Sequence, residues 1–575
     1  MLKLWKFLQP DRTLVVLVLV LTFLQTMSSL YLPTLMSDIV DKGVIPGHIP
    51  YIIHVGAFML AVTLAGGAAA VYASLYGAKA TAGFGQRIRS RLFGHVEDFT
   101  LHEFDQIGTS SLIVRTTNDV MQVQQLVNML LRMMVMAPLT ALGGIILAVY
   151  TDARLAWIVL VSIPVLGLAI YLLMRRGLAL FRAIQNKVDG LNRVLRENLT
   201  GTRVIRAFNR TTYEVARFDD ANVGLTDTSV EVFQLMAMVM PAVMLVMNLS
   251  TVAIVWFGGL EINAGTLQIG QFMAFIQYVM QIMFAVMMVS MMAFMIPRGQ
   301  ASALRINEVL AMEAEITDPA EPQESGTLRG QVEFDHVTFY YPGAEEPAVA
   351  DVTFTARAGE TTAIIGGTGA GKSTVVNLIP RFYDVSGGTL RVDGVDVRAM
   401  SQERLRAKIG YVPSRPVLFT GTVADNIRYG DLGADDAAVQ RAAATAQATE
   451  FIDTLGDGFQ SVIAQGGANL SGGQKQRLAI ARALVRRAEI YVLDDCFSAL
   501  DYKTDALLRQ ALRREVKAAT VLIVAQRVST VMDADQIVVM DDGRVAGVGT
   551  HRQLMESCAV YREIVSSQLT PEEIA

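Results

Sequence analysis

The sequence predicts two parts of different fold class: an N-terminal all-α transmembrane domain of six helices, then a C-terminal α/β domain with a helical subdomain. Only 18% of the 575 residues are charged and 52% are hydrophobic, whereas soluble domains carry about a quarter charged residues. The shortfall lies in residues 1–300, while residues 325–575 have the composition of a soluble α/β domain. We expect a membrane domain over residues 1–310, a polar linker over 311–330 and an α/β domain over 331–575.

Six apolar runs are long enough to cross a membrane, for which a helix needs about 20 apolar residues. They cover residues 13–37, 55–78, 133–151, 155–174, 232–260 and 262–297. The first run is too long for a cleaved signal peptide and is expected to stay as a helix. Lys and Arg gather between the second and third runs and between the fourth and fifth. The positive-inside rule therefore places these segments and both chain termini in the cytosol.

The side chains inside the apolar runs bear on what the membrane part handles. The third, fifth and sixth runs are rich in methionine, which suits adaptable apolar pockets but also serves as ordinary packing. Gln234, Asn248, Gln277 and Gln281 are amides, which are costly in hydrocarbon, so they either line a substrate path or join helices. Acidic and basic residues are missing from the deep parts of the runs. This argues against an ion or proton relay and favours an apolar or amphipathic substrate.

The net charge and the cysteine content argue against a nucleic-acid-binding protein and against a disulfide-stabilised one. The net charge of −5 gives no indication of nucleic-acid binding. Cys496 and Cys558 both fall in the soluble part. Two cysteines do not make a disulfide framework, and a reducing cytosolic setting fits them.

The first functional motif of the α/β domain is a phosphate-binding loop. A short apolar strand over residues 361–365 runs into a glycine-rich loop that is followed by a helical pattern. Its backbone N–H groups would converge on phosphate oxygens, Lys372 would reach the outer phosphates and Ser373 would bind Mg²⁺. The candidate nucleotide-binding residues are Gly366, Thr368, Gly369, Ala370, Gly371, Lys372, Ser373 and Thr374. The sequence therefore predicts a site for ATP with Mg²⁺.

Two further motifs follow the loop. Residues 470–474 read LSGGQ and precede a helical pattern, so that a hydroxyl, unhindered N–H groups and a helix dipole form a second phosphate clamp. Residues 490–495 read IYVLDD, an apolar strand that ends in Asp494 and Asp495. One chain cannot readily wrap both clamps around one phosphate, so the chemistry itself suggests a dimer.

The loop, the LSGGQ and the acid-tipped strand, in this order, resemble the nucleotide-binding domain of ABC transporters. With the six apolar runs, the whole chain resembles an exporter-type half-transporter. The resemblance implies that Tyr341 stacks on adenine and that Asp494 holds Mg²⁺ through water. It also implies that Ser471, Gly473 and Gln474 complete a partner's site and that Asp501 links the two sites. On the same resemblance, residues 117–120 and 201–205 are the contact points with nucleotide-binding domains.

Three positions depart from the family pattern around one phosphate. Asp495 stands where the family has a catalytic Glu, Gln526 where it has His, and Ser414 where it has a Gln that touches Mg²⁺. Asp495 is one methylene shorter, and a misplacement of about 1 Å can cost roughly a hundredfold in rate. Gln526 donates a hydrogen bond but carries no charge, and Ser414 needs a bridging water to reach the metal. The pattern predicts a site that binds ATP and hydrolyses it slowly, beside an intact signature.

The leading hypothesis is therefore one half of a heterodimeric multidrug exporter, paired with a second, non-identical ABC half-transporter chain. It would move small apolar compounds out of membrane lipid, across a bacterial plasma membrane, by ATP hydrolysis mainly at the partner's site. Two alternatives stay open: transport of a lipid, peptide or siderophore by the same fold, or a mainly regulatory subunit that senses ATP. The sequence names neither the substrate nor the partner.

Overall fold

The computed structural model describes residues 2–324 and 329–569, apart from the side chains of residues 2, 178, 291, 293 and 294. Four residues of the predicted linker, 325–328, and the end of the chain, 570–575, lie outside the described part. The chain forms two compact units. Unit 1 comprises Met1–Glu97 and Thr109–Met312, and unit 2 comprises Asp98–Gly108 and Glu313–Ala575.

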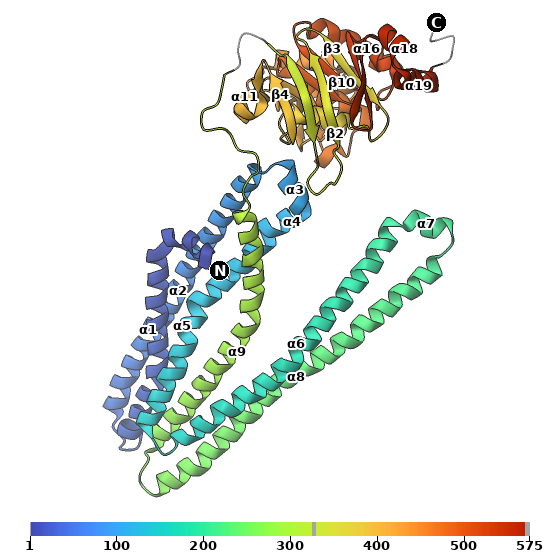
Figure 1. Ribbon diagram of the computed structural model, residues 1–575. Coiled ribbons are helices and arrows are strands. Elements are labelled where there is room, and N and C mark those ends of the chain that lie inside the picture. The colour runs from blue at the N-terminus through green and yellow to red at the C-terminus, as the bar shows by residue number, and fades with distance from the viewer. Residues whose placement is uncertain (1, 325–328, 570–575) are drawn as a thin grey trace. The chain divides into compact units, whose positions relative to one another are not determined.

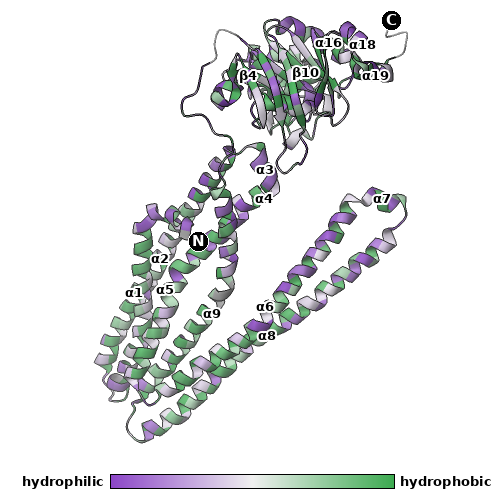
Figure 2. Ribbon diagram, in the orientation of Figure 1, coloured by the Kyte–Doolittle hydropathy of each residue, from purple (hydrophilic) through white to green (hydrophobic). Residues whose placement is uncertain are grey.

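Unit 1 is built of helices alone among its described residues (Figure 1). In chain order they are η1 (Leu2–Asp11), α1 (Arg12–Ile39), η2 (Val40–Val44), α2 (Ile49–Glu97), α4 (Thr109–Val114), η3 (Arg115–Asp119), α5 (Val120–Thr151), α6 (Ala156–Thr200), α7 (Thr202–Ala207), α8 (Thr211–Asn263) and α9 (Ile269–Ala311). Six helical stretches are long and apolar enough to cross a membrane. Green, hydrophobic residues are frequent along these helices in Figure 2, interrupted by paler and purple ones. The predicted six-helix membrane domain is confirmed.

The carboxylate of Asp41 marks where the long helix α9 begins. At the start of α9, Gly270 N donates to Asp41 Oδ1 at 2.6 Å and Gln271 N donates to Asp41 Oδ2 at 3.1 Å. The first N–H groups of a helix lack partners within the helix, and a carboxylate there also interacts favourably with the helix dipole. Asp41 thus joins the end of the first spanning stretch to the start of the sixth.

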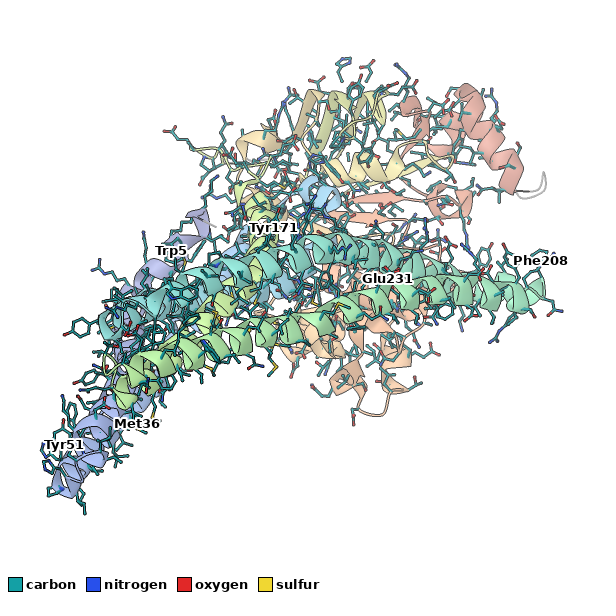
Figure 3. The ribbon with its side chains drawn as sticks, turned by 90° about the horizontal axis from the view of Figure 1, so that it is seen from below. Trp5, Met36, Tyr51, Tyr171, Phe208 and Glu231 are labelled. Atoms are coloured by element: carbon teal, nitrogen blue, oxygen red, sulfur yellow. The ribbon has the colours of Figure 1, made fainter. Side chains whose placement is uncertain are left out.

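Helices α6 and α8 form a long hairpin within unit 1. They pack along each other and diverge from α1, α2, α5 and α9 toward the short helix α7 at the tip (Figure 1). Figure 3 labels Tyr171 on α6 and Glu231 on α8 along this hairpin, and Phe208 at its tip. Phe208 is 73% exposed in the single chain. Helix α7 overlaps the second predicted contact point, residues 201–205, and presents apolar surface that nothing in unit 1 covers.

The first predicted contact point, residues 117–120, is wrong for Asp119 and Val120, whereas Thr117 and Asn118 are exposed. Asp119 and Val120 are buried inside unit 1. Ser302 Oγ donates to Asp119 Oδ1 at 2.9 Å, and Arg305 Nε donates to Asp119 Oδ2 at 2.7 Å. Asp119 therefore fastens the start of α5 to α9 and is not available to a nucleotide-binding domain.

The segment that joins unit 2 instead is Asp98–Gly108, which contains α3 (Leu101–Ile107). Thr100 opens α3 with a capping box in which its side chain accepts from His102 N at 3.2 Å, and Thr100 N donates to Glu103 Oε2 at 2.7 Å. Glu103 Oε1 also accepts from Glu315 N at 3.0 Å. Glu103 is 3% exposed, and these bonds satisfy its buried carboxylate.

Unit 2 contains a four-stranded antiparallel sheet and a six-stranded sheet. The first has the order β2 (Val349–Ala356), β1 (Val332–Phe339), β4 (Gly387–Val392) and β5 (Val395–Asp396). The second has the order β12 (Arg544–Gly549), β11 (Gln536–Asp541), β3 (Thr361–Gly366), β10 (Thr520–Val524), β9 (Ile490–Asp494) and β6 (Ile409–Val412). It is parallel except for β12. Every residue of β9 and β10 is buried, as expected of central parallel strands covered on both faces.

Helices and a two-stranded ribbon complete unit 2. The ribbon pairs β7 (Gly421–Thr422) with β8 (Val462–Ile463). The helices are α10 (Lys372–Leu378), η4 (Val397–Ala399), α11 (Gln402–Ala407), α12 (Val423–Arg428), α13 (Asp436–Thr445), α14 (Thr449–Asp453), η5 (Gly458–Gln460), η6 (Gln465–Gly467), α15 (Gly472–Val485), α16 (Tyr502–Glu515), α17 (Val528–Val531), α18 (His551–Ser557) and α19 (Ala559–Gln568). The predicted α/β domain with a helical subdomain is confirmed.

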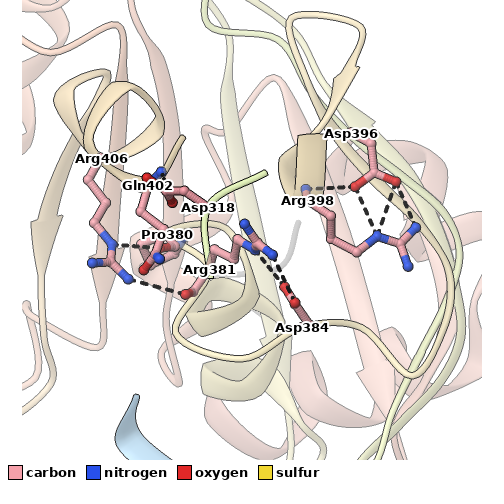
Figure 4. A network of polar contacts seen from close by, with 8 residues as sticks. All are labelled: Asp318, Pro380, Arg381, Asp384, Asp396, Arg398, Gln402 and Arg406. Atoms are coloured by element: carbon pink, nitrogen blue, oxygen red, sulfur yellow. Dashed lines mark hydrogen bonds and ion pairs between the residues drawn. The ribbon is translucent and has the colours of Figure 1, made fainter. Parts of the chain in front are cut away.

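A polar network holds the turn that follows α10 (Figure 4). Arg381 is 5% exposed and its Nε donates to Asp384 Oδ1 at 2.7 Å. Arg406 Nε donates to the carbonyl of Pro380 at 3.1 Å. Since α10 begins at Lys372, a predicted site residue, this network fixes the far end of the helix on which the candidate site depends.

Candidate nucleotide site

The phosphate loop joins the buried strand β3 to α10. Gly369 and Gly371 have φ angles of 88° and 86°, in the left-handed region that favours glycine. A Cβ at Gly366 would lie 2.2 Å from the carbonyl oxygen of Met540. Glycine is therefore required at Gly366 to pack β3 against β11, and at the other two to turn the chain so that its N–H groups face one point.

Lys372 lies across this loop. Its Nζ donates to the carbonyl oxygens of Gly366 at 3.0 Å and Gly367 at 2.6 Å. The side chain is 8% exposed, and burial lowers the pKa of the ammonium despite the nearby Asp495 and Asp494. The loop thus presents a buried positive charge next to its converging N–H groups, which is a site for phosphate oxygens.

Two oxygen ligands suited to a magnesium ion meet beside the lysine. Ser373 Oγ donates to Asp494 Oδ1 at 2.9 Å. Asp494 ends β9 and is 3% exposed, and burial raises the pKa of its carboxyl. A hydroxyl and a single carboxylate fit Mg²⁺, which keeps several waters and takes further oxygens from nucleotide phosphates. Within the described residues there is no group of three or more His, Cys, Asp or Glu that could hold a metal without a nucleotide.

The next residue, Asp495, is paired with Gln526. Gln526 Nε2 donates to Asp495 Oδ2 at 3.0 Å. The backbone of Asp495 has a φ of 45°, and its N–H donates to the carbonyl of Val524 at 3.0 Å. Burial raises the pKa of the Asp495 carboxyl. Asp495 and Gln526, two of the three positions that depart from the family pattern, therefore lie together, and their side chains are hydrogen-bonded to each other.

These groups surround a pocket of about 390 Å³. It is lined by Tyr341, Ala348, Thr368, Gly369, Gly371, Lys372, Ser373, Thr374, Ser414, Asp495, Val524 and Gln526. Tyr341 is 38% exposed, with its hydroxyl 3.1 Å from Thr374 Oγ1 and its ring against those of Phe339 and Tyr383. An exposed ring at the rim and a cationic loop at the base are what a nucleotide needs for its base and its phosphates.

Three predicted nucleotide or metal residues, Gly366, Ala370 and Asp494, are not among the residues that line the pocket. Ala370 and Asp494 are buried, and Gly366 ends β3. Ala370 contributes to packing, since it belongs to the hydrophobic core formed between both sheets. Asp494 is hydrogen-bonded to Ser373, which does line the pocket.

The predicted signature residues do not line the pocket of their own chain. Ser471 Oγ accepts from Gln474 N at 3.3 Å, and Gln474 Oε1 accepts from Ser471 N at 2.8 Å, a capping box that opens α15. Gly473 lies at the same turn, close to the backbone of Ala499. Asp501 caps α16 by accepting from Thr504 N at 3.0 Å, and this bond lowers the pKa of its carboxyl. The turn that would form the second phosphate clamp is thus present, with Ser471 and Gly472 exposed and Gly473 and Gln474 half-buried.

Sequence reasoning missed two features that bear on this unit. The α3 segment carried a readable signal, since Thr100 and Glu103 have the spacing of a capping box. Gln568, which contacts the loop that carries Gln526, carried none, because its partner is brought near only by tertiary packing.

The six membrane-crossing stretches and the phosphate-loop pocket define a multi-pass membrane transporter driven by a nucleotide. Residues 15–286 match the ABC transporter transmembrane region, and residues 349–498 match the ABC transporter model. The chain belongs to the ABC transporter family, as an exporter-type half-transporter with its transmembrane and ATP-binding domains fused. Its ATP-binding domain couples ATP hydrolysis to transport, and exporters of this family work as dimers.

Relatives of nearly full length support this assignment. The chain is 44% identical over 566 residues to an uncharacterized ABC transporter ATP-binding protein of Mycobacterium tuberculosis, covering 98% of this chain and 97% of the relative. It is 35% identical over 489 residues to an ATP-dependent lipid A-core flippase of Chromobacterium violaceum, covering 84% and 83%. The fold is similar to a bacterial Atm1-family ABC exporter with ATP bound, with a TM-score of 0.80 at 24% identity and coverage of 98% and 99%.

Proposed function

We propose that this chain is the degenerate-site half of a heterodimeric exporter that moves apolar or amphipathic compounds out of a bacterial inner membrane. Its pocket binds ATP with Mg²⁺ and hydrolyses it slowly. Its signature, residues 471–474, completes the active site of a non-identical partner chain. Both termini lie in the cytosol.

One observation carries the proposal. The pocket brings Lys372, Ser373, Asp495 and Gln526 together, while the signature of the same chain lies outside it and is partly exposed. A site with one phosphate clamp is incomplete, so a second chain must supply the other. Val204 on α7 and Phe208 directly after it are likewise exposed, and they offer an apolar docking surface for a nucleotide-binding domain.

The non-identical partner follows from the chemistry of this pocket. Asp495 is held by the amide of Gln526, a group with no proton to give or take near pH 7. Ser414 is exposed at the pocket and short. A homodimer would repeat these features at both sites and have no fast site. A partner that carries Glu and His at the matching positions would provide one.

The membrane part supports an apolar or amphipathic substrate. Gln234, Asn248 and Gln277 are exposed on their helices in the single chain, as expected of amides that line an interior path between two half-transporters. Gln281 has the other predicted role, since its Nε2 donates to the carbonyl of Ser29 at 3.3 Å and joins α9 to α1.

A lipid substrate is the second candidate. It is favoured by the likeness to a protein named as a lipid A-core flippase. A lipid is itself amphipathic, so the same lining of methionines and amides suits it.

The two substrates are separable in proteoliposomes that hold this chain with a partner half-transporter from the same genome. We expect ATP-dependent uptake of an apolar cationic dye such as Hoechst 33342, without ATP-dependent flipping of a fluorescent phospholipid. Flipping without dye uptake would favour the lipid candidate. Efficient dye uptake by vesicles that hold this chain alone would contradict the heterodimer.

A further inference from the structure

The last helix of unit 2, α19, ends against the loop that carries Gln526. Gln568 Oε1 accepts from Val528 N at 2.8 Å, and Gln568 Nε2 donates to the carbonyl of Gln526 at 2.8 Å. One side-chain amide thus brackets the backbone on both sides of Arg527. Helix α19 is itself well anchored, because Tyr561 and Val565 are fully buried.

The loop needs such a partner. Helix α17 begins at Val528, and its N-cap residue, Arg527, makes no side-chain cap. The first N–H groups of a helix have no acceptor within the helix, and an arginine side chain has no acceptor atom to offer. Gln568 supplies from another helix the acceptor that an N-cap Ser or Asp would supply locally.

The two hydrogen bonds of Gln568 help to fix a loop that lines the nucleotide pocket. Upstream, Ala525 N donates to the carbonyl of Ile364 at 3.1 Å, which ties the loop to β3. Downstream, Gln568 holds Gln526 O and Val528 N. With its backbone fixed on both sides, Gln526 directs its own side chain to Asp495 Oδ2 at 3.0 Å. A continuous series of hydrogen bonds therefore runs from α19 to the acidic group beside Lys372.

We propose that Gln568 is a positioning residue of the nucleotide site, through which the C-terminal helix holds Gln526 where it contacts the outermost phosphate of bound ATP. The inference rests on the proposed ATP binding and extends it to α19. It predicts that the loss of Gln568 weakens the recognition of the third phosphate and leaves the recognition of the base and the inner phosphates intact.

The test compares the affinity of the purified full chain for two fluorescent nucleotides, mant-AMP-PNP, which has a third phosphate analogue, and mant-ADP, which has none. Gln568→Leu removes both hydrogen bonds at similar volume. We expect it to weaken mant-AMP-PNP binding about fivefold, the scale of one or two lost hydrogen bonds, with mant-ADP binding unchanged. Gln568→Glu keeps the acceptor for Val528 N and loses the donor, so its affinity for mant-AMP-PNP should lie between those of the unaltered chain and Gln568→Leu. It serves as the test variant if Gln568→Leu does not fold.

Ser567→Ala is the matched control, because the Ser567 hydroxyl bonds only to Ile564 O of its own helix, at 2.8 Å. It should change neither affinity. In a Gln526→Ala background, Gln568→Leu should add no further loss, since the residue acts through Gln526. If Gln568→Leu weakened the binding of both nucleotides equally, Gln568 would have a general structural role and the inference would be overturned. The same holds if Gln568→Leu lowered mant-AMP-PNP affinity as much in the Gln526→Ala background as in the unaltered chain. If the unaltered chain bound neither nucleotide, the proposed function would fail as well, and that result is distinct from normal binding that Gln568→Leu leaves unchanged.

Discussion

The phosphate loop at Lys372 and the signature turn at Ser471 belong to the same unit and have the same construction, a glycine-containing turn that opens a helix. They differ in what surrounds them. The loop meets Asp495, Gln526 and Ser414, three departures from the family pattern, whereas the signature turn keeps its capping box and its glycines. The loop side needs particular side chains for hydrolysis, while the signature side acts through a hydroxyl and backbone N–H groups. One chain can therefore lose catalysis at its own pocket and still complete the pocket of another.

The largest expected effect comes from damage to the signature. A Cβ at Gly473 would lie 3.1 Å from the carbonyl of Ala499, and Gly473→Asp would also place a negative charge against a phosphate. We expect ATP turnover of the paired transporter to fall by about a hundredfold or more, the scale of losing a donor to a developing anion. ATP binding by the isolated chain should not change.

Gly456→Asp is the control for this variant, because Gly456 is exposed and a Cβ there meets nothing within 4 Å. It should leave both turnover and binding as they are. Weaker ATP binding by the isolated Gly473→Asp chain would show that the turn serves its own pocket, and the contrast between the two regions would be lost.

The next largest effect comes from repair of the pocket. Asp495→Glu with Gln526→His restores the longer carboxylate and a titratable side chain. We expect turnover at this pocket to rise by about tenfold to a hundredfold, because a misplacement of about 1 Å costs on that order. The measurement is steady-state ATPase activity, with Lys372→Ala added as a control that should abolish the gain. An unchanged rate would mean that some other feature limits this pocket.

Much of this contrast was readable in the sequence, because it depends on local motifs. The P-loop needs a strand, glycines and a helix in succession, and the structure has all three, from β3 through Gly371 to α10. The six long apolar runs likewise predicted six membrane-spanning helices and no other structure. The prediction failed where a residue's partner is distant in the chain. Residues 117–120 were assigned to a contact surface, but Asp119 is buried by Ser302 and Arg305. The loop gave no sign that Ala370 faces the core and not the pocket.

A smaller effect is expected at the rim of the pocket. Tyr341→Ala removes a ring that lines the pocket and bonds to Thr374. We expect ATP affinity to fall by about threefold to tenfold, in line with the loss of one aromatic stacking contact. Tyr340→Ala is a matched control, since Tyr340 is similarly exposed and does not line the pocket. Equal losses from both variants, measured by fluorescent ATP titration, would remove Tyr341 from the site.

The smallest effect is expected at Ser414. Ser414→Gln lengthens a side chain that is exposed at the pocket, so that it reaches the metal without a bridging water. Alone it should raise turnover only about twofold to threefold, because the Asp495 side chain remains one methylene shorter than a Glu. A larger gain in the ATPase assay would make Ser414, and not Asp495, the main cause of the slow site.

The most direct test of the central claim is the Mg²⁺-dependent ATPase activity of this chain purified alone, with ATP binding measured on the same sample. We predict clear ATP binding with little turnover, and turnover that appears when a partner half-transporter is added. Vigorous turnover by the chain alone would contradict this prediction. Asp495 and Gln526 would then suffice for hydrolysis, and the transporter would be a homodimer.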